Sequence, residues 1–331
     1  MTQPSLARWL ETIWHSRSPA VLPLLPLSWL FRLAVQLRRW FWQSGLGRPQ
    51  RLPVPVIVVG NITVGGTGKT PVVDWLVRTC RTAGFVPGIV SRGYGGRPRS
   101  APYLVQPDDD PAEVGDEPLL LRRRTGVPVC ICTDRVAAGQ RLLAEGVDLI
   151  VADDGLQHYA LARDIEIAVV DGERRLGNGW MLPAGPLREP ASRLAAVDAV
   201  LLNGGEGFAG GTVFHGRLAD AVALDGSERR SLESFRGQQV RVVAGVGNPQ
   251  RFHAQLAAAG MEVIPVSVAD HHRVSLEQLF QDSDIPVFMT EKDAVKYRPL
   301  PGCALWVVPM EIDMPAAFRE FLLVRLDGLS A

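Results

Sequence analysis

The sequence Val54-Pro-Val-Ile-Val-Val-Gly-Asn-Ile-Thr-Val-Gly-Gly-Thr-Gly-Lys-Thr70 runs from an apolar strand into a glycine-rich turn. Lys69 and Thr70 follow the turn at the expected start of a helix. The backbone N–H groups of such a turn close around a polyphosphate, and the helix N-terminus and the lysine add positive charge. A threonine hydroxyl at this place binds a phosphate-bound Mg²⁺. The stretch therefore predicts a nucleoside triphosphate site.

One position departs from the strict phosphate-binding loop, which has glycine where this chain has Thr63. Two neighbouring glycines supply the flexibility instead. An ordinary glycine-rich turn is the alternative interpretation, and the nucleotide site is favoured over it. The residues expected to bind the nucleotide are Gly65, Gly66, Thr67, Gly68, Lys69 and Thr70.

Composition limits the class of protein. A chain of 331 residues is long enough for about two domains. Its formal net charge is zero, which argues against nucleic acid as the main partner. Cys130 and Cys132 share one face of a strand, a spacing that favours reduced thiols in the cytosol over a zinc site. No feature of the sequence points to a protein partner.

Residues 19–43 form an unusually apolar segment, without the features of a signal peptide. Arg32 and two prolines argue against a bilayer-crossing helix. From Trp29 onward, polar side chains recur as a narrow stripe on an otherwise aromatic and aliphatic helix. We expect this helix to lie in a membrane surface, where tryptophan and arginine suit the headgroup region. Packing on the protein's own core is the open alternative.

Short apolar runs then alternate with helical patterns, which predicts a parallel sheet flanked by helices. The expected strands are 54–59, 86–90, 127–132, 147–152, 165–170 and 198–202. Polar residues and glycines follow each run, and ligands bind at the carboxyl ends of parallel strands. The predicted fold class is α/β, with a P-loop NTPase-like parallel sheet, a smaller C-terminal α/β domain and the N-terminal amphipathic helix.

Asp153 and Asp154 follow the strand 147–152, as carboxylates do at the end of a Walker B strand. They are expected to hold Mg²⁺ beside Thr70, directly or through water, although capping of a following helix is the alternative. His158 extends this turn and either reaches the phosphates or caps a helix.

Further loops and turns carry candidate residues. Asp116 and Glu117 follow an acidic, proline-containing loop, and solvated carboxylates without a special role are the open alternative. Arg188 and Glu189 end a proline-rich loop that suits a substrate or metal contact, with a plain surface loop as the alternative. Arg92 and Arg135 stand in the polar turns that follow the expected strands 86–90 and 127–132.

The expected domains are an N-terminal helical segment (1–50), a P-loop domain (51–225) and a smaller α/β domain (226–331), with a linker near 205–235. In the last domain, Asp270-His271-His272 follows the expected strand 261–268, and Thr290-Glu-Lys-Asp293 follows 285–289.

Taken together, seven motifs resemble one family, the tetraacyldisaccharide 4′-kinases, over residues 10–325 and in matching order. The motifs are Val-Gly-Asn-x-x-Val-Gly-Gly-Thr-Gly-Lys-Thr-Pro, Ser-Arg-Gly-Tyr-Gly, Val-Gly-Asp-Glu-Pro, Asp-Asp-Gly-Leu-Gln-His, Pro-x-Gly-Pro-Leu-Arg-Glu, Asp-His-His and Thr-Glu-Lys-Asp. A small hydroxyl residue at the position of Thr63 is also usual in that family.

The resemblance implies transfer of the γ-phosphoryl group of ATP, with Mg²⁺, to the 4′-hydroxyl of a tetraacylated glucosamine disaccharide 1-phosphate. The product is the bis-phosphorylated lipid A precursor. The implied place is the cytoplasmic face of the bacterial inner membrane, with the protein peripheral or monotopic and its N-terminal helix meeting the acylated substrate.

The resemblance also implies roles for individual residues. Lys69 and Thr70 would serve the phosphates and Mg²⁺, and Asp116 would be the catalytic base acting with His271. The implied metal ligands are Thr70, Asp154 and Glu189, supported by Asp153 and Glu117, and the implied substrate contacts are Arg188, Arg92 and Glu117. The candidates for holding the phosphate already on that substrate are Arg92, Arg135 and Arg188.

Two other functions would use some of the same residues. A membrane ATPase would also combine a phosphate loop, an Asp-Asp strand end and an amphipathic helix, but it would hydrolyse ATP without an acceptor. A GTP-driven switch is disfavoured because the sequence has no Asn-Lys-x-Asp base-reading motif.

Overall fold

The structure is a computed structural model that describes residues 6–16, 18–97, 100–266, 274–275, 279–280, 285–298 and 304–330. Its contacts form two compact units, which are described separately. The first unit comprises Met1–Val90, Asp134–Phe214 and Met314–Ala331, and the second comprises Ser91–Thr133 and His215–Asp313. The contacts thus group the chain differently from the contiguous domains 1–50, 51–225 and 226–331, which stay a prediction.

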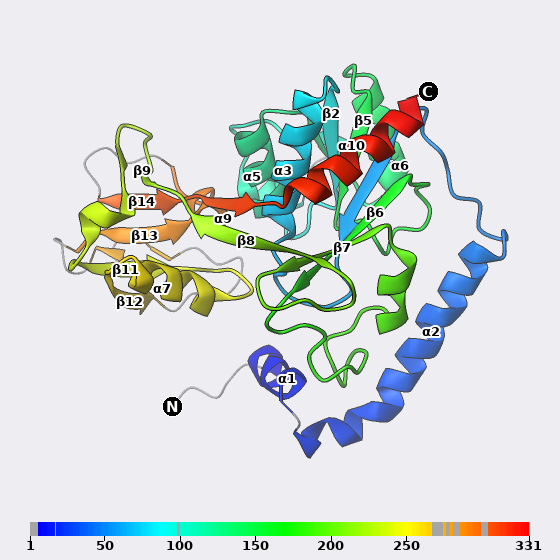
Figure 1. Ribbon diagram of the computed structural model, residues 1–331, viewed down its shortest axis with the longest axis horizontal. Coiled ribbons are helices and arrows are strands. Elements are labelled where there is room, and N and C mark those ends of the chain that lie inside the picture. Colours follow the sequence, from blue (N-terminus) through cyan, green and yellow to red (C-terminus); the bar gives the residue numbers. More distant parts are fainter. Residues whose placement is uncertain are drawn as a thin grey trace. The chain divides into compact units, whose positions relative to one another are not determined.

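The helices and strands of the first unit are shown in Figure 1. They are α1 (Leu6–Trp14), η1 (Pro19–Leu24), α2 (Leu25–Gln43), β1 (Val56–Gly60), α3 (Lys69–Thr82), β2 (Pro87–Ser91, its last residue assigned to the second unit), α6 (Arg135–Leu143), β5 (Leu149–Asp153), β6 (Ile165–Asp171), η2 (Ala191–Ala196), β7 (Ala199–Asn203) and α10 (Ala316–Ser330). β8 (Thr212–Leu218) begins in this unit.

The sheet of the first unit is parallel, in the order β7-β6-β1-β5-β2. The first residues of β8 add a further parallel strand beside β7. Every residue of β1 and β5 is buried, because helices cover a parallel sheet on both faces and its strands are then apolar throughout. These strands begin and end within two residues of their predicted bounds, so the predicted parallel sheet is confirmed.

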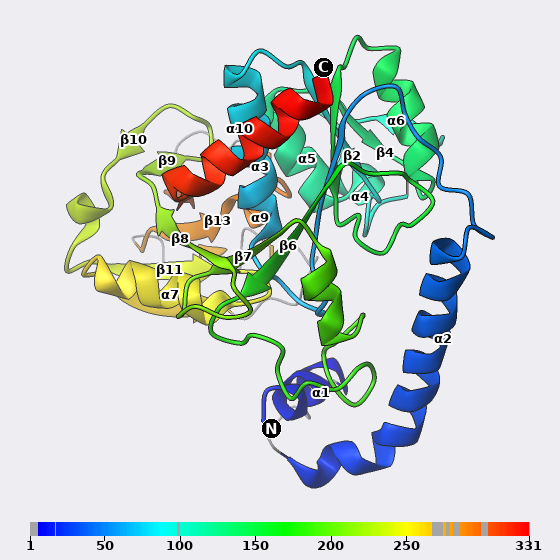
Figure 2. The same cartoon turned by 45° about the vertical axis from the view of Figure 1, so that its right-hand side comes forward.

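Helices α3 and α10 cover part of this sheet. α3 packs against β1 and β5. α10 lies across α3 in both views (Figures 1 and 2), where the rings of Trp75 and Phe318 are 5.8 Å apart. Leu322 and Leu326 of α10 are fully buried. The last helix of the chain is therefore part of the core of the first unit.

Helix α2 lies at the margin of the unit in both views. Its large apolar side chains are mostly exposed, and they include Leu27, Trp29, Leu30, Leu33, Leu37, Trp40 and Phe41. By length and composition, the helical segment Pro19–Gln43 is able to cross a membrane. The predicted amphipathic helix is present, and the alternative of packing on the protein's own core does not describe its exposed apolar side.

The second unit has its own elements. They are β3 (Tyr103–Leu104), α4 (Pro111–Val114), α5 (Asp116–Thr125), β4 (Val129–Ile131), β9 (Ala221–Ala223), β10 (Arg229–Arg230), η3 (Leu232–Phe235), β11 (Gln239–Val243), α7 (Pro249–Ala258), β12 (Glu262–Val266), β13 (Val287–Thr290), α9 (Glu291–Ala294), β14 (Leu305–Val308) and β15 (Met310–Asp313).

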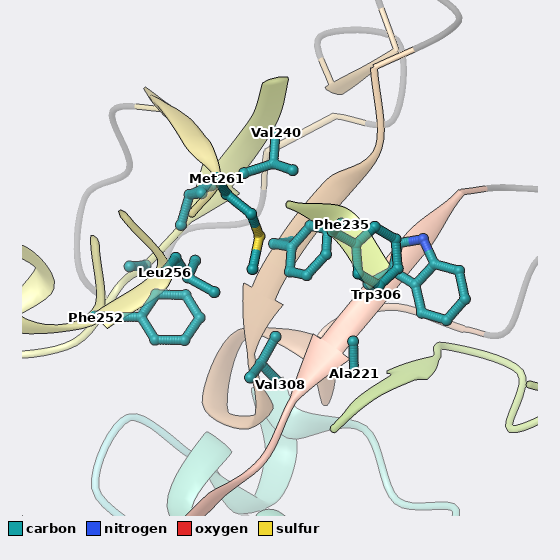
Figure 3. Packing of buried hydrophobic residues seen from close by; sticks show 11 residues of the cluster. Ala221, Phe235, Val240, Phe252, Leu256, Met261, Trp306 and Val308 are labelled. Carbon is teal, nitrogen blue, oxygen red and sulfur yellow. The ribbon is translucent and has the colours of Figure 1, made fainter. Parts of the chain in front are cut away.

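A six-stranded sheet, in the order β10-β9-β14-β13-β11-β12, organises the second unit. One face of it packs on Phe235, whose ring centre lies 5.1 Å from that of Trp306 (Figure 3). The ring centre of Phe288 lies 5.0 Å from that of Phe235. Leu256 from α7 belongs to the same cluster. The predicted smaller C-terminal α/β fold is confirmed.

The expected linker near 205–235 is wrong, because the structure has strands β8, β9 and β10 there. These strands are only partly buried, and β8 exposes alternate side chains such as His215 and Arg217. Half-exposed strands of this kind carry glycine and polar residues as loops do, so composition alone does not distinguish such a strand from a loop.

Candidate functional site

The glycine-rich turn between β1 and α3 is held in a conformation that requires glycine at one position. Gly68 has a φ of 90°, and a Cβ atom there would lie 2.4 Å from Nδ2 of Asn203. That same Nδ2 donates a hydrogen bond to the carbonyl of Thr67 at 3.2 Å. The end of β7 therefore fixes the turn just before Lys69, where α3 begins.

Thr63, the departure from the strict phosphate-binding loop, has a structural explanation. It forms an antiparallel bridge with Leu187 and is buried. The N–H of Val64 donates to the carbonyl of Pro186 at 2.8 Å. An extended residue suits this pairing better than glycine, because glycine loses more conformational freedom on ordering. The proline-rich loop before Arg188 thus holds the start of the turn in place by backbone pairing.

Asp154 lies against two cations at the phosphate loop. Its carboxylate is 3.5 Å from Nζ of Lys69 and accepts hydrogen bonds from Arg188 at 3.0 and 3.1 Å. Burial alone would raise the pKa of Asp154, but Lys69 and Arg188 outweigh it and hold that pKa well below its usual range. An ionised carboxylate is therefore present beside the phosphate-binding lysine.

Arg188 joins this carboxylate to the turn. Its guanidinium group donates to the carbonyl of Asn61 at 3.1 Å and to the side-chain oxygen of Asn61. The amide of Asn61 in turn donates to the carbonyl of Gly65 at 3.3 Å. Asn61, Arg188 and Asp154 form one polar network around the loop.

The partners of Glu189 differ from those of Asp154. It is buried, accepts from the hydroxyl of Tyr159 at 3.0 Å on both oxygens, and lies 3.3 Å from Nε of Arg193. Burial, and then the charge of Glu189, raise the pKa of Tyr159 to about 12. Among the described residues, no group of three or more His, Cys, Asp and Glu side chains is arranged to hold a metal ion.

The donor set at the loop nevertheless suits Mg²⁺, which binds through one or two carboxylates together with substrate phosphates and waters. Thr70 follows Lys69 at the start of α3, and Asp154 faces that lysine. Asp153 ends β5 and is aligned with Val59 of β1, one residue before the turn begins. A hydroxyl and an ionised carboxylate are therefore available at the place where the phosphates would lie.

The acidic pair Asp116 and Glu117 belongs to the second unit, where both begin helix α5. Lys296 lies 3.5 Å from Asp116 and 3.0 Å from Asp293. Lys292 lies 3.1 Å from Glu117. Two of the motifs noted in the sequence thus meet, because lysines in and after Thr290-Glu-Lys-Asp293 neutralise the carboxylates of Val-Gly-Asp-Glu-Pro.

The remaining predicted residues are less informative. Arg92 is an exposed residue of the second unit. Arg135 is buried at the start of α6. His271, with Asp270 and His272, lies outside the described residues.

His158 caps no α-helix, because the turn after β5 does not continue into one. Burial, followed by the charge of Arg135, lowers the pKa of its imidazole to about 4. Within the described part of the chain, its Nε2 atom has no hydrogen-bond partner.

This lowered pKa predicts a pH-dependent stability. The unfolded chain, with a histidine pKa of about 6.5, binds more protons than the folded chain between pH 6.5 and 4. The free energy of unfolding therefore falls as the pH falls through this window, and His158→Gln should flatten that fall. Urea unfolding across the window measures it, with His215→Gln at an exposed position as control. Parallel curves for wild type and His158→Gln would contradict the assignment.

Several residues at the site were not predicted from the sequence. Asn61 and Asn203 stood in the polar strand ends, where their type was visible but their contacts were not. Tyr159 and Arg193, which hold Glu189, carry no motif signal. A small pocket beside the phosphate loop is lined by Arg174 and Arg175 among others, and both follow the end of β6.

The model of the Tetraacyldisaccharide-1-P 4'-kinase family matches residues 20–327. The chain belongs to this family. Tetraacyldisaccharide 4'-kinase of Nitrosococcus oceani is 49% identical over 318 residues, covering 95% of this chain and 93% of the relative. That of Pseudomonas paraeruginosa is 48% identical over 330 residues, with 99% of each chain covered. The resemblance drawn from the motifs is confirmed.

A solved structure supports both the fold and the family. LpxK from Aquifex aeolicus, crystallised in complex with ATP, is similar with a TM-score of 0.78 and 26% sequence identity. The match covers 94% of this chain and 99% of that chain. The predicted α/β fold is confirmed, and so is the prediction of an ATP-binding kinase of the tetraacyldisaccharide 4'-kinase family.

Proposed function

We propose that this chain transfers the γ-phosphoryl group of ATP to the 4′-hydroxyl of a tetraacylated glucosamine disaccharide 1-phosphate, which yields the bis-phosphorylated lipid A precursor. The observation that carries the proposal is the network of Lys69, Asp154 and Arg188 at the phosphate loop, in a chain that matches the kinase family from residue 20 to 327.

In the first unit, the amides of Gly65 to Thr70 and the ammonium group of Lys69 bind the phosphates of ATP. Thr70, Asp154 and Glu189 would hold Mg²⁺, with Asp153 as a supporting carboxylate. When bound there, the ion would supply positive charge to the phosphate oxygens. Arg188 holds Asp154 in place and contacts the substrate or the transferred group. A carboxylate held between two cations stays ionised and does not compete for protons near neutral pH.

In the second unit, Asp116 accepts the proton of the sugar hydroxyl as the new P–O bond forms, and His271 acts with it. Lys296 pairs with both Asp116 and Asp293, and this pairing restrains the Asp116 carboxylate. Glu117 and Arg92 bind the polar part of the substrate.

The place of the reaction is the cytoplasmic face of the inner membrane, where α2 lies in the headgroup region. An acylated disaccharide is anchored in the bilayer, so an enzyme that meets it there gains from a helix with exposed tryptophan, leucine and arginine side chains.

Replacing two exposed leucines of α2 tests this placement. Leu30→Glu with Leu37→Glu should weaken binding to anionic lipid vesicles by about 100-fold, since each side chain contributes about 1.5 kcal/mol or more on leaving water. Flotation with vesicles measures the binding. Val324→Glu, at an exposed position of α10, is the matched control. Equal flotation of all three proteins would exclude α2 as the membrane contact.

The function itself is tested by following labelled γ-phosphate from ATP, with and without the detergent-solubilised tetraacylated disaccharide 1-phosphate. Label in the lipid, dependent on acceptor, supports the kinase. Phosphate released to water at the same rate with or without lipid would overturn the proposal and favour a membrane ATPase.

A further inference from the structure

Two polar contacts join helix α2 to other described residues of the first unit. The buried hydroxyl of Ser28 donates to the carbonyl of Met181 at 2.8 Å. The guanidinium group of Arg38 donates to the carbonyl of Gln157, also at 2.8 Å. Met181 lies in the loop that ends in Arg188 and Glu189, whereas Gln157 lies in the turn that begins with Asp154. Both segments that carry candidate metal ligands are thus attached to this helix.

Gln157 relays the contact toward the phosphate loop. While its carbonyl accepts from Arg38, its side-chain amide donates to the carbonyl of Asn61 at 2.9 Å. The same carbonyl of Asn61 accepts from Arg188, which holds Asp154. A continuous series of hydrogen bonds, through Gln157, Asn61 and Arg188, therefore connects Arg38 to the Asp154 carboxylate.

A second route leads from Arg38 to Glu189. The Arg38 guanidinium carbon is 5.8 Å from the centre of the Tyr159 ring, and that of Arg163 is 5.6 Å from it. Contacts of this kind attract a cation to an aromatic ring and restrict both groups. The hydroxyl of Tyr159 donates to both oxygens of Glu189. The orientation of Glu189 thus depends on a ring that a residue of α2 helps to hold.

We infer that Arg38 is a positioning residue, which holds the turn of Asp154 and, through Tyr159, the carboxylate of Glu189, and so couples the attachment of α2 to the phosphoryl-transfer site. The inference rests on the proposed function for its kinetic readout. A helix fixed in a lipid surface would hold Arg38 in place, and the two carboxylates would be ordered when the enzyme is on the membrane.

The kinetic test compares Arg38→Ala with Arg48→Ala, which removes the same charge at an exposed position just after α2. At saturating vesicles that contain the lipid acceptor, we expect Arg38→Ala to lower kcat about tenfold and to raise the Mg²⁺ concentration for half-maximal rate, with the KM for lipid unchanged. Arg38→Lys keeps a donor and a cation over the ring, so it should restore most of the rate. Equal kinetics of Arg38→Ala and Arg48→Ala would overturn the inference.

Two measurements distinguish a failure of this inference from a failure of the proposed function. Tyr159→Phe retains the ring but removes the hydroxyl, so it should raise the Mg²⁺ requirement about tenfold without changing vesicle binding. Hydrogen exchange of residues 154–160 needs no activity: anionic vesicles should slow exchange in wild type and Arg48→Ala but not in Arg38→Ala. Equal slowing in all three overturns the coupling, whereas a wild type that labels no lipid overturns only the proposed function.

Discussion

Lys69→Met is expected to lower kcat for lipid phosphorylation by about 10³-fold or more, the size of effect seen when one preorganised charge is removed from a transition state. Methionine keeps the unbranched stem of the lysine but removes the ammonium group. Asp154 retains Arg188 at 3.0 Å in the variant, so the loop loses a charge without leaving its carboxylate unpaired. The folded structure should therefore survive the change.

Transfer of labelled phosphate to the lipid gives kcat, and a fluorescent ATP analogue gives the affinity for nucleotide. The affinity should fall much less than kcat, because the loop amides remain. Arg141→Met, which removes an exposed cation paired with Glu145, serves as the control and should behave as wild type. A loss of rate below tenfold in Lys69→Met would show that this lysine does not stabilise the transferred group.

Asp116→Asn is expected to reduce kcat by about 10²- to 10⁴-fold, the usual contribution of a positioned general base. Asparagine has the shape of aspartate but accepts no proton at neutral pH. Lys296 keeps its contact with Asp293 at 3.0 Å, so the surroundings of the substituted side chain remain paired. Binding of ATP and of lipid should change little.

The measurement is again label in lipid, at saturating ATP and acceptor, together with circular dichroism to confirm the fold. Glu145→Gln, an exposed carboxylate on the first unit, is the control. Full turnover by Asp116→Asn would exclude it as the base and would leave its pair with Lys296 a purely structural role.

The parallel strands could be predicted because each is an apolar run that a polar residue ends, and a sheet buried on both faces demands that pattern. The strand β8 could not, since a half-exposed strand that presents His215 and Arg217 to solvent has the composition of a loop. Similarly, Thr63 looked anomalous in the sequence because its partner, Leu187, is distant in the chain.

Site residues, too, could be predicted where a local sequence motif marks them and could not where only distant contacts define them. Lys69, Thr70 and Asp154 stand in short sequence motifs that predict phosphate and metal binding. The structure brings Lys69 and Asp154 together. Glu189 was assigned to the metal through the family resemblance, and its actual partners, Tyr159 and Arg193, were not foreseen. Side chains that act through tertiary contacts alone leave no periodic or motif signal, so no reading of the sequence would have found them.

Helix α10 has a consequence for the order in which this protein acquires its structure during synthesis. Domains usually fold as the ribosome releases them, amino-terminal first. Here Phe318, Leu322 and Leu326 complete the core of the first unit, and Arg325 pairs with Asp198 on the same unit, although all the residues of the second unit are translated before them. The first unit therefore cannot reach its final packing until translation has passed the second unit.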